Sequence, residues 1–148
     1  MKIVITGGMG FVGSNLIKNL NSKKNQIIVI DNFSTNVNNS SNGFELINLD
    51  LTDKNLLEKI NFQSADIFIH LAGPSSGPAS AKDPKGTIEM SNRGIFNVLE
   101  LCEKLSVKRL LFASSMAVYG NPIESPVNEE TVCNPISYYS VAKLSAEN

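Results

Sequence analysis

The sequence predicts an α/β fold in which helices cover both faces of a doubly wound parallel sheet. Short apolar runs, typical of strands buried on both faces, alternate with longer stretches whose apolar residues follow the helical period. A glycine-rich loop joins the first predicted strand to the first helix, and an aspartate ends the second strand. Strand–helix alternation of this kind implies parallel strands joined by right-handed crossovers.

The predicted elements follow one another with short connections. Strands are expected at residues 2–6, 26–31, 44–50, 66–72 and 108–114. Helices are expected at 11–20, at 54–60 with Thr52 or Asp53 as the N-cap, at 85–105, and from about Ser137 onward. Loops are expected at 32–43, 73–84 and 115–135, which are rich in turn-forming residues. The length of 148 residues favours one domain over residues 1–148.

The composition argues against several classes of protein. The net charge of −1 lacks the basic excess of a nucleic-acid-binding protein. Glycines interrupt the N-terminal sequence too early for a signal peptide, and no apolar run is long enough to span a membrane, so we expect a cytoplasmic protein. Cys102 and Cys133 form no CxxC motif, and Cys102 lies within an apolar helical pattern. We therefore predict neither a disulfide nor a metal site.

The stretch TGGMGFVGS at residues 6–14 contains the pattern Gly8-x-Gly10-x-x-Gly13 between a predicted strand and a predicted helix. Gly7 and Gly8 permit a tight turn at the end of the strand. Gly10 lets the backbone approach a pyrophosphate, and Gly13 lets the helix pack close to the strand. The free N–H groups and the positive dipole end of the helix then favour phosphate binding. The alternative is a glycine-rich turn without a ligand.

Asp31 ends the second predicted strand, where a carboxylate can accept hydrogen bonds from the ribose hydroxyls of NAD. The same carboxylate would repel the 2′-phosphate of NADP. No Lys or Arg occurs between Lys24 and Lys54 to neutralise that phosphate. The sequence therefore favours NAD over NADP, although an aspartate at this position can also simply start a turn.

Two adjacent tyrosines precede a lysine near the end of the chain. On a helix Tyr139 and Lys143 share one face, whereas Tyr138 points elsewhere. A phenol titrates near ~10 and is a poor base at neutral pH, but a neighbouring ammonium stabilises its phenolate form. A Tyr/Lys pair at this spacing is common by chance on helix surfaces. Because this pair follows the nucleotide-binding motifs and a serine-rich strand end, we predict that Tyr139 and Lys143 form a catalytic pair.

A serine is expected to complete this catalytic group. Ser114 and Ser115 lie at the end of the fifth predicted strand, at the sheet edge where doubly wound folds bind ligands. A serine hydroxyl there can relay a proton between a substrate and a tyrosine. The alternative is a serine that only stabilises a turn.

The motifs TGGMGFVGS, DNFST, NLDLTD, HLAG, SSMAVYG and YSVAK resemble, in this order, those of the extended short-chain dehydrogenases/reductases. More narrowly, the chain resembles the NAD-dependent epimerase/dehydratase family, of the UDP-glucose 4-epimerase type. The resemblance implies a Rossmann-type sheet with strand order 3-2-1-4-5 and NAD as the cofactor. It selects Ser115 over Ser114, and it makes His70 part of a strand signature and not a base.

The resemblance also implies a set of cofactor contacts. These are Phe11 and Val12 at the pyrophosphate, Asp31 and Asn32 at the adenosine ribose, Asp50 and Leu51 at the adenine, Leu71, Ala72 and Gly73 beyond the fourth strand, and Tyr139 and Lys143 at the nicotinamide end. Two positions depart from the pattern. Ser91 stands where an asparagine is usual, three residues before Gly94, and Ser75 stands where some epimerases have a lysine, two residues after the HLAG-like segment.

The implied reaction is epimerisation of a nucleotide sugar, with Tyr139 as the base that removes a proton from a sugar hydroxyl at C4. Met116 and Ala117 replace the Asp-Glu pair of the dehydratases, and the acid of the uronic-sugar decarboxylases is also missing near this point. These differences favour a UDP-hexose 4-epimerase. The alternatives are a dehydratase or ketoreductase of the same family, a non-catalytic NAD-binding module, or an inactive remnant.

The chain ends at Asn148, within a predicted helix and before the sixth strand and the C-terminal substrate domain that the family implies. We therefore expect an incomplete NAD-binding domain from a longer enzyme. The resemblance further implies a homodimer in the complete protein, with the helix at 85–105 and the last helix forming the interface.

Overall fold

The computed structural model describes residues 1–21, 24–35, 43–74 and 77–148. The predicted loops at 32–43 and 73–84 therefore lie partly outside the described residues. The strands are β1 (Lys2–Thr6), β2 (Gln26–Asp31), β3 (Glu45–Asn48), β4 (Ile67–His70) and β5 (Arg109–Phe112). The helices are α1 (Phe11–Asn21), α2 (Leu56–Lys59), α3 (Gly77–Lys82), α4 (Pro84–Lys104), the 3₁₀-helix η1 (Met116–Tyr119) and α5 (Tyr138–Glu147).

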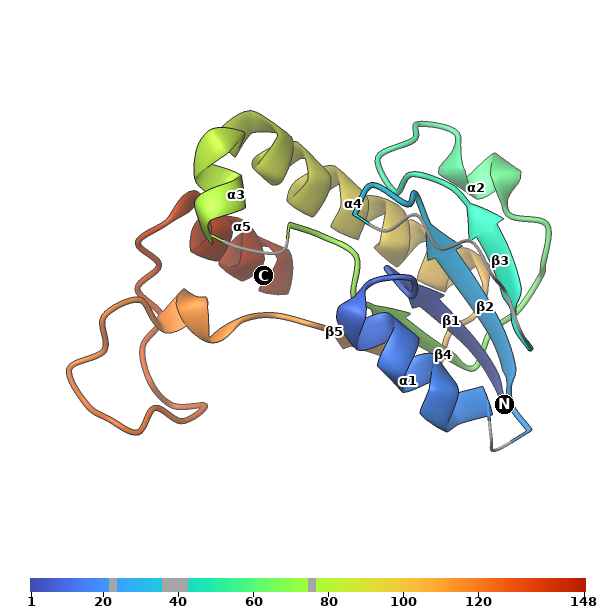
Figure 1. Cartoon of the computed structure of the whole chain (residues 1–148), viewed down its shortest axis with the longest axis horizontal. Helices are drawn as coiled ribbons and strands as arrows, with labels where there is room; N and C mark the ends of the chain where they lie inside the picture. Colours follow the sequence, from blue (N-terminus) through green and yellow to red (C-terminus); the bar gives the residue numbers. More distant parts are fainter. Residues whose placement is uncertain (22–23, 36–42, 75–76) are drawn as a thin grey trace. The chain divides into compact units, whose positions relative to one another are not determined.

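All five strands are parallel and form one sheet in the order β3-β2-β1-β4-β5 (Figure 1). This order and the α/β class confirm the predicted fold. The chain forms two compact units. The first unit comprises residues 1–72 and 96–113 and contains the sheet, α1 and α2. The second comprises residues 73–95 and 114–148 and contains α3, η1 and α5, while α4 contributes to both units.

The centre of the sheet is buried, as the uninterrupted apolar runs predict. β1 lies between β2 and β4, with Ile5 opposite Val29 of β2 and Ile69 of β4. Val4, Ile5 and Phe68 are fully buried. Removal of this apolar surface from water is the main force that stabilises the sheet. Because the strands are parallel, their carboxyl ends share one edge of the sheet, and the predicted cofactor residues of the first unit follow those ends.

Three strands are shorter than predicted. β3, β4 and β5 each end two residues earlier than the apolar runs at 44–50, 66–72 and 108–114. The N–H of Leu71 still donates to the Thr6 carbonyl at 3.1 Å, but Thr6 is the last residue of β1. The ladder stops where the neighbouring strand stops, which a single apolar run does not reveal.

The short helix α2 is capped differently from the prediction. Its N-cap is Asn55, and no side chain caps the helix. The Thr52 hydroxyl donates to Asp50 Oδ1 at 2.7 Å, and Asp53 Oδ1 accepts the N–H of Asn55 at 2.9 Å. Both side chains therefore stabilise turns that precede the helix. The predicted cap at Thr52 or Asp53 is wrong, and the helix begins at Leu56.

The loop predicted at 73–84 contains the helix α3, which the composition did not indicate. Pro78 lies in its first turn, where the missing N–H would have no intrahelical partner in any case. The Ser80 hydroxyl is buried and donates to the Gly77 carbonyl at 2.7 Å. The prediction of a loop throughout is therefore wrong, because Gly, Pro and Ser here satisfy a helical turn.

Helix α4 occupies the predicted range to within one residue at each end. Asp83 precedes it, and its carboxylate accepts the N–H of Gly86 at 2.9 Å. The Thr87 hydroxyl donates to the Asp83 carbonyl at 2.8 Å. An aspartate followed by Pro84 at the first helical position is a strong start signal.

Helix α5 confirms the predicted start near Ser137. The Ser137 hydroxyl oxygen accepts the N–H of Ser140 at 3.1 Å, and Ser140 Oγ accepts the N–H of Ser137 at 2.9 Å. This reciprocal capping box fixes the first turn, which carries both tyrosines. The helix packs against α3 and η1 within the second unit.

We expect Ser137→Ala to lower the free energy of unfolding by about 1 kcal/mol, because it removes the side-chain acceptor of this cap. Urea unfolding followed by circular dichroism measures the change, since the chain contains no tryptophan. Ser145→Ala is the control, because Ser145 makes one exposed hydrogen bond to Asn92 and should change stability by less than about 0.5 kcal/mol. An equal loss in both variants would contradict the prediction.

Candidate functional site

At two positions of the glycine loop between β1 and α1, neighbouring backbone leaves no room for a Cβ atom. Gly7 has φ +67°, and a Cβ atom there would lie 2.6 Å from the Ala72 nitrogen. A Cβ at Gly13 would lie 2.5 Å from the Gly8 Cα atom and 2.6 Å from the Gly7 carbonyl oxygen. Both distances are too short for a side chain of any kind. Gly7 and Gly13 therefore let the turn form and let α1 approach it closely.

Gly10 has a different environment within the same loop. A Cβ at this position would meet only the Gly7 carbonyl oxygen, at 3.3 Å. Its N–H donates to that carbonyl at 3.1 Å, and its own carbonyl accepts the N–H of Ser14 at 2.9 Å. The next residues, Phe11 and Val12, are 87% and 62% exposed at the N-terminus of α1. The protein leaves space beside the loop that a ligand can use.

Asp31 connects the end of β2 to the glycine loop. One carboxylate oxygen accepts the N–H of Met9 at 2.9 Å, and the other accepts the N–H of Phe33 at 2.8 Å. Each carboxylate oxygen can accept more than one hydrogen bond, so both retain capacity for hydroxyl donors. Asp31 therefore holds the loop in place and presents a negatively charged acceptor beside it.

The residue after Asp31 forms a second polar connection. The Asn32 amide donates to Asp50 Oδ2 at 2.8 Å. Asp50 Oδ1 accepts both the N–H of Thr52 at 2.8 Å and the Thr52 hydroxyl at 2.7 Å. Burial raises the pKa of the Asp50 carboxyl, but the hydrogen bonds from Thr52 and Asn32 outweigh burial and lower it below its ordinary value. The structure thus brings together two of the predicted cofactor residues, at the ends of β2 and β3.

Leu71 and Ala72 follow β4 and are the last residues of this segment of the first unit. Leu71 continues the ladder with Thr6, and the N–H of Ala72 lies 3.5 Å from Thr6 Oγ1. The same hydroxyl lies 2.6 Å from Nδ1 of His70, whose ring stacks on Phe112 with centroids 5.5 Å apart. His70 is a buried, hydrogen-bonded residue in the first unit.

Ser115 belongs to the second unit and is the N-cap of η1. Its Oγ accepts the N–H of Ala117 at 3.2 Å, which leaves the hydroxyl proton available for donation. Its neighbour Ser114 donates to the carboxylate of Glu147 near the end of α5. The two adjacent serines therefore have different partners.

Tyr139 and Lys143 lie one turn apart on α5, in the same unit as Ser115. Lys143 is only 6% exposed, whereas Tyr138 is 55% exposed. A Cβ at Gly73, which has φ +151°, would lie 3.6 Å from Lys143 Nζ, so the backbone of Gly73 passes close to this ammonium. Burial lowers the pKa of Lys143, and the negative charge of Glu147 opposes that shift.

Two residues of these networks escaped the sequence analysis. Thr6 ends β1 directly after three buried apolar residues and is itself buried, so its hydroxyl is expected to have a hydrogen-bond partner. Glu147 follows Lys143 by one turn, a spacing at which opposite charges interact on a helix. Both signals are visible in the sequence once the helix and strand are assigned.

Comparison with a protein-family model identifies the family of this chain. The model of the NAD dependent epimerase/dehydratase family matches residues 3–148. The chain belongs to this family. The resemblance inferred from the motifs is thereby confirmed, and NAD is the cofactor of the family.

Individual relatives are similar along nearly the whole chain. It is 37% identical over 147 residues to a provisionally named UDP-glucose 4-epimerase of Methanocaldococcus jannaschii, covering 98% of this chain and 48% of that protein. It is 37% identical over 158 residues to UDP-glucuronic acid decarboxylase 1 of Arabidopsis thaliana, and this match covers 99% of this chain and 35% of that protein. The crystal structure of UDP-glucose 4-epimerase from Thermus thermophilus in complex with NAD matches with a TM-score of 0.91 at 32% identity, covering 99% of this chain and 49% of that chain. The chain thus spans about half the length, or less, of these relatives.

The residues of the first unit fit NAD. The glycine loop leaves room at Gly10, the N–H groups that begin α1 have no intrahelical acceptors by position, and the Asp31 carboxylate can accept ribose hydroxyls. The described residues of the whole chain contain no cluster of His, Cys, Asp or Glu arranged to hold a metal ion. None of their helices is long and apolar enough to cross a bilayer.

We expect Gly10→Ala to raise the Kd for NADH at least about tenfold and to cost less stability than Gly13→Ala, because the added methyl group would have one close protein neighbour, the Gly7 carbonyl oxygen at 3.3 Å. Gly13→Ala should instead lower the free energy of unfolding by about 2 kcal/mol, because its methyl group overlaps the backbone of Gly7 and Gly8. NADH fluorescence titration and urea unfolding separate the two effects. Unchanged NADH affinity in Gly10→Ala would contradict the expected approach of the pyrophosphate.

The buried Lys143 gives a pH-dependent prediction. Because its folded-state pKa is lowered, the unfolded chain binds more protons between that lowered pKa and the ordinary value of 10.5. The free energy of unfolding should therefore rise with pH in this interval, relative to Lys143→Met. Urea unfolding from about pH 7 to about pH 10 measures the difference. Lys85 is exposed, so the free energy of unfolding of Lys85→Met should change with pH in the same way as that of the wild type. If the free energy of unfolding of Lys143→Met also followed the wild type at every pH, the prediction would be refuted.

Proposed function

We propose that this chain is the NAD-binding part of a nucleotide-sugar epimerase that acts at C4 of a UDP-hexose. The observation that carries the proposal is the buried Lys143 one helical turn from Tyr139, in the same unit as Ser115. Membership of the NAD dependent epimerase/dehydratase family supports it. A non-catalytic NAD-binding module would have no use for a tyrosine, a lysine and a serine together in one unit.

We assign cofactor binding mainly to the first unit. The N-terminus of α1, with Phe11 and Val12, would hold the pyrophosphate, because free N–H groups and the helix dipole favour negative charge there. Asp31 and Asn32 would hold the adenosine ribose. Asp50 and Leu51 would flank the adenine. Beyond β4, Leu71, Ala72 and Gly73 would complete the cofactor site, with Tyr139 and Lys143 at the nicotinamide end.

The three polar residues of the second unit have distinct roles in the proposal. Tyr139 accepts the proton of the sugar hydroxyl at C4, as general base. The Lys143 ammonium stabilises the phenolate form of Tyr139 and donates to the nicotinamide ribose. Ser115 keeps its proton while accepting from Ala117, so it can donate to the sugar oxygen. The chemistry that NAD supplies when bound is hydride transfer.

The segment after Ser115 favours epimerisation over elimination. Met116 is 77% exposed, and neither it nor Ala117 can protonate a leaving hydroxyl. A 4-keto sugar formed at this site would keep its substituents, turn, and be reduced on its other face. The 37% identity with an Arabidopsis UDP-glucuronic acid decarboxylase makes decarboxylation the second candidate. A cytoplasmic location and a homodimer remain predictions.

Tyr139→Phe should lower kcat for interconversion of UDP-glucose and UDP-galactose by at least about 10²-fold, because it removes the base. The Kd for NADH should change by less than about twofold, since a phenyl ring keeps the packing. Product sugars are measured by chromatography of the purified protein's reactions, and NADH binding is measured by fluorescence.

The matched control is Tyr138→Phe, which removes the neighbouring hydroxyl and should retain activity. Activity retained in Tyr139→Phe, or lost equally in both variants, would refute the assigned base. Release of CO₂ from UDP-glucuronic acid, without hexose interconversion, would favour the decarboxylase instead.

A further inference from the structure

The turn that follows β3 carries Asp50 and Leu51, the residues we assign to the adenine. The N–H of Asp53 donates to the Asp50 carbonyl at 3.1 Å, which closes the turn. β3 is an edge strand of the sheet, and β2 is its only neighbouring strand among the described residues. A turn at the end of an edge strand needs other contacts if it is to present a ligand-binding carboxylate in one orientation.

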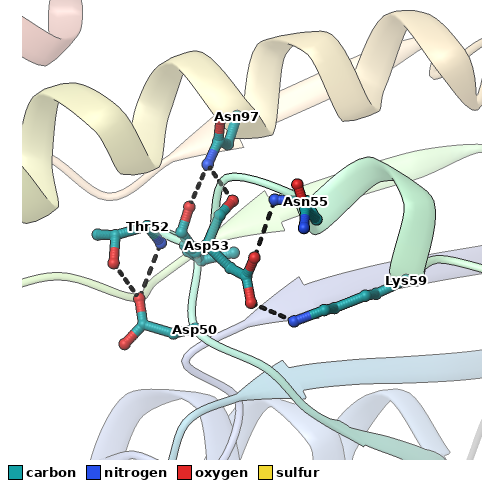
Figure 2. Close-up of polar contacts among 7 residues, drawn as sticks. Asp50, Thr52, Asp53, Asn55, Lys59 and Asn97 are labelled. Carbon is teal, nitrogen blue, oxygen red and sulfur yellow. Dashed lines mark hydrogen bonds and ion pairs between the residues drawn. The ribbon is translucent and has the colours of Figure 1, made fainter.

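Helix α4 supplies such a contact through the side chain of Asn97 (Figure 2). The Asn97 amide nitrogen donates to the Leu51 carbonyl at 2.6 Å and to the Asp53 carbonyl at 3.2 Å. Both partners are carbonyl oxygens, which can only accept, so the nitrogen must be the atom that faces them. One side chain therefore donates to two backbone carbonyls of the turn.

The bond to Leu51 has a consequence on the opposite side of the same peptide. In a trans peptide the carbonyl and the following N–H point in opposite directions, so holding the Leu51 carbonyl also orients the N–H of Thr52. That N–H donates to Asp50 Oδ1 at 2.8 Å. Asn97 is thus linked to the Asp50 carboxylate through one rigid peptide group, without contacting the carboxylate in Figure 2.

The other oxygen of the same carboxylate is held by Asn32 of the neighbouring strand end, at 2.8 Å. The carboxylate is therefore oriented from two sides, by Asn32 directly and by Asn97 through the peptide. Lys59, which pairs with Asp53 in Figure 2, contacts the far end of the turn and not Asp50.

We propose that Asn97 is a positioning residue for adenine binding, which fixes the Asp50 carboxylate through the Leu51–Thr52 peptide. The proposal rests on the cofactor site proposed above and adds a residue that touches no cofactor. It predicts that loss of the Asn97 amide weakens binding of the adenosine part of NAD. Because the effect passes through one peptide, it also predicts a change at Asp50 in the absence of any ligand.

Asn97→Ala tests both consequences in the purified protein. We expect the Kd for NADH, and the Kd for ADP-ribose in competition with NADH, each to rise about tenfold, the scale of one well-placed hydrogen bond. Without ligand, the pKa of the Asp50 carboxyl should rise towards its ordinary value, because the hydrogen bond from Thr52 that lowers it is loosened. Carboxyl NMR titration measures this shift.

Lys104→Met is the matched control on the same helix. The Lys104 ammonium donates to the carbonyls of Leu57 and Ile60, so it also anchors α4 to backbone beyond β3, but away from Asp50. This variant should lose stability and keep the NADH affinity of the wild type within about twofold. Equal weakening in both variants would reduce Asn97 to a general structural role and overturn the proposal.

The outcomes separate this inference from the proposed function. Wild-type protein that fails to bind NADH would overturn the cofactor site itself. Tight NADH binding that is unchanged in Asn97→Ala would overturn only the role of Asn97. An unchanged Asp50 titration in Asn97→Ala would also overturn it, because the peptide link would then carry no effect.

Discussion

The close backbone approach between the end of β1 and the start of α1 is the constraint on which the proposed cofactor site depends. At Gly7 and Gly13 there is no space for even one added carbon. Because the turn is this tight, the Gly7 N–H meets the Ile30 carbonyl at 3.0 Å and the Met9 N–H meets the Asp31 carboxylate. A looser turn would separate the helix N-terminus from the acidic strand end, and pyrophosphate and ribose could no longer be held together.

Asp31 shows how one side chain can serve both fold and ligand. A carboxylate buried without partners would be costly, but backbone donors satisfy each of its oxygens once. The remaining acceptor capacity is what a ribose can use. Asp50 repeats this arrangement with Asn32 and Thr52. At both strand ends, hydrogen bonds made within the protein orient a carboxylate before any ligand arrives.

In the second unit, the burial of the Lys143 ammonium opposes stability. Lys143 is placed where its charge is poorly solvated, since burial lowers its pKa and the negative charge of Glu147 opposes that shift. A buried ammonium is unfavourable for stability, and the proposed pair with Tyr139 would use it for proton transfer. Small changes around one scaffold can direct such a pair to different reactions. The chain is 37% identical to a relative named for epimerisation and to one named for decarboxylation, so overall similarity does not decide between them.

Local sequence patterns determined the positions of the strands, the turn before α1 and the start of α5. The apolar runs located all five strands, the glycines located the turn before α1, and the order β3-β2-β1-β4-β5 followed from the resemblance that the motifs carried. The spacing of Tyr139 and Lys143 on one helical face is likewise local, as is the cap at Ser137. These features depend on backbone period, capping and conformational freedom, which a short stretch of sequence records.

Only the tertiary structure decided the features that join distant segments. The Asn97 amide meets the Leu51 carbonyl across 46 positions of sequence, and the Thr6 hydroxyl meets His70 across 64. The ends of β3, β4 and β5 depend on where the neighbouring strands stop, and the burial of Lys143 depends on the packing around α5. α3 was missed because Gly, Pro and Ser favour loops on average. The sequence lists the donors and acceptors, but only the folded chain determines which of them are close enough to pair.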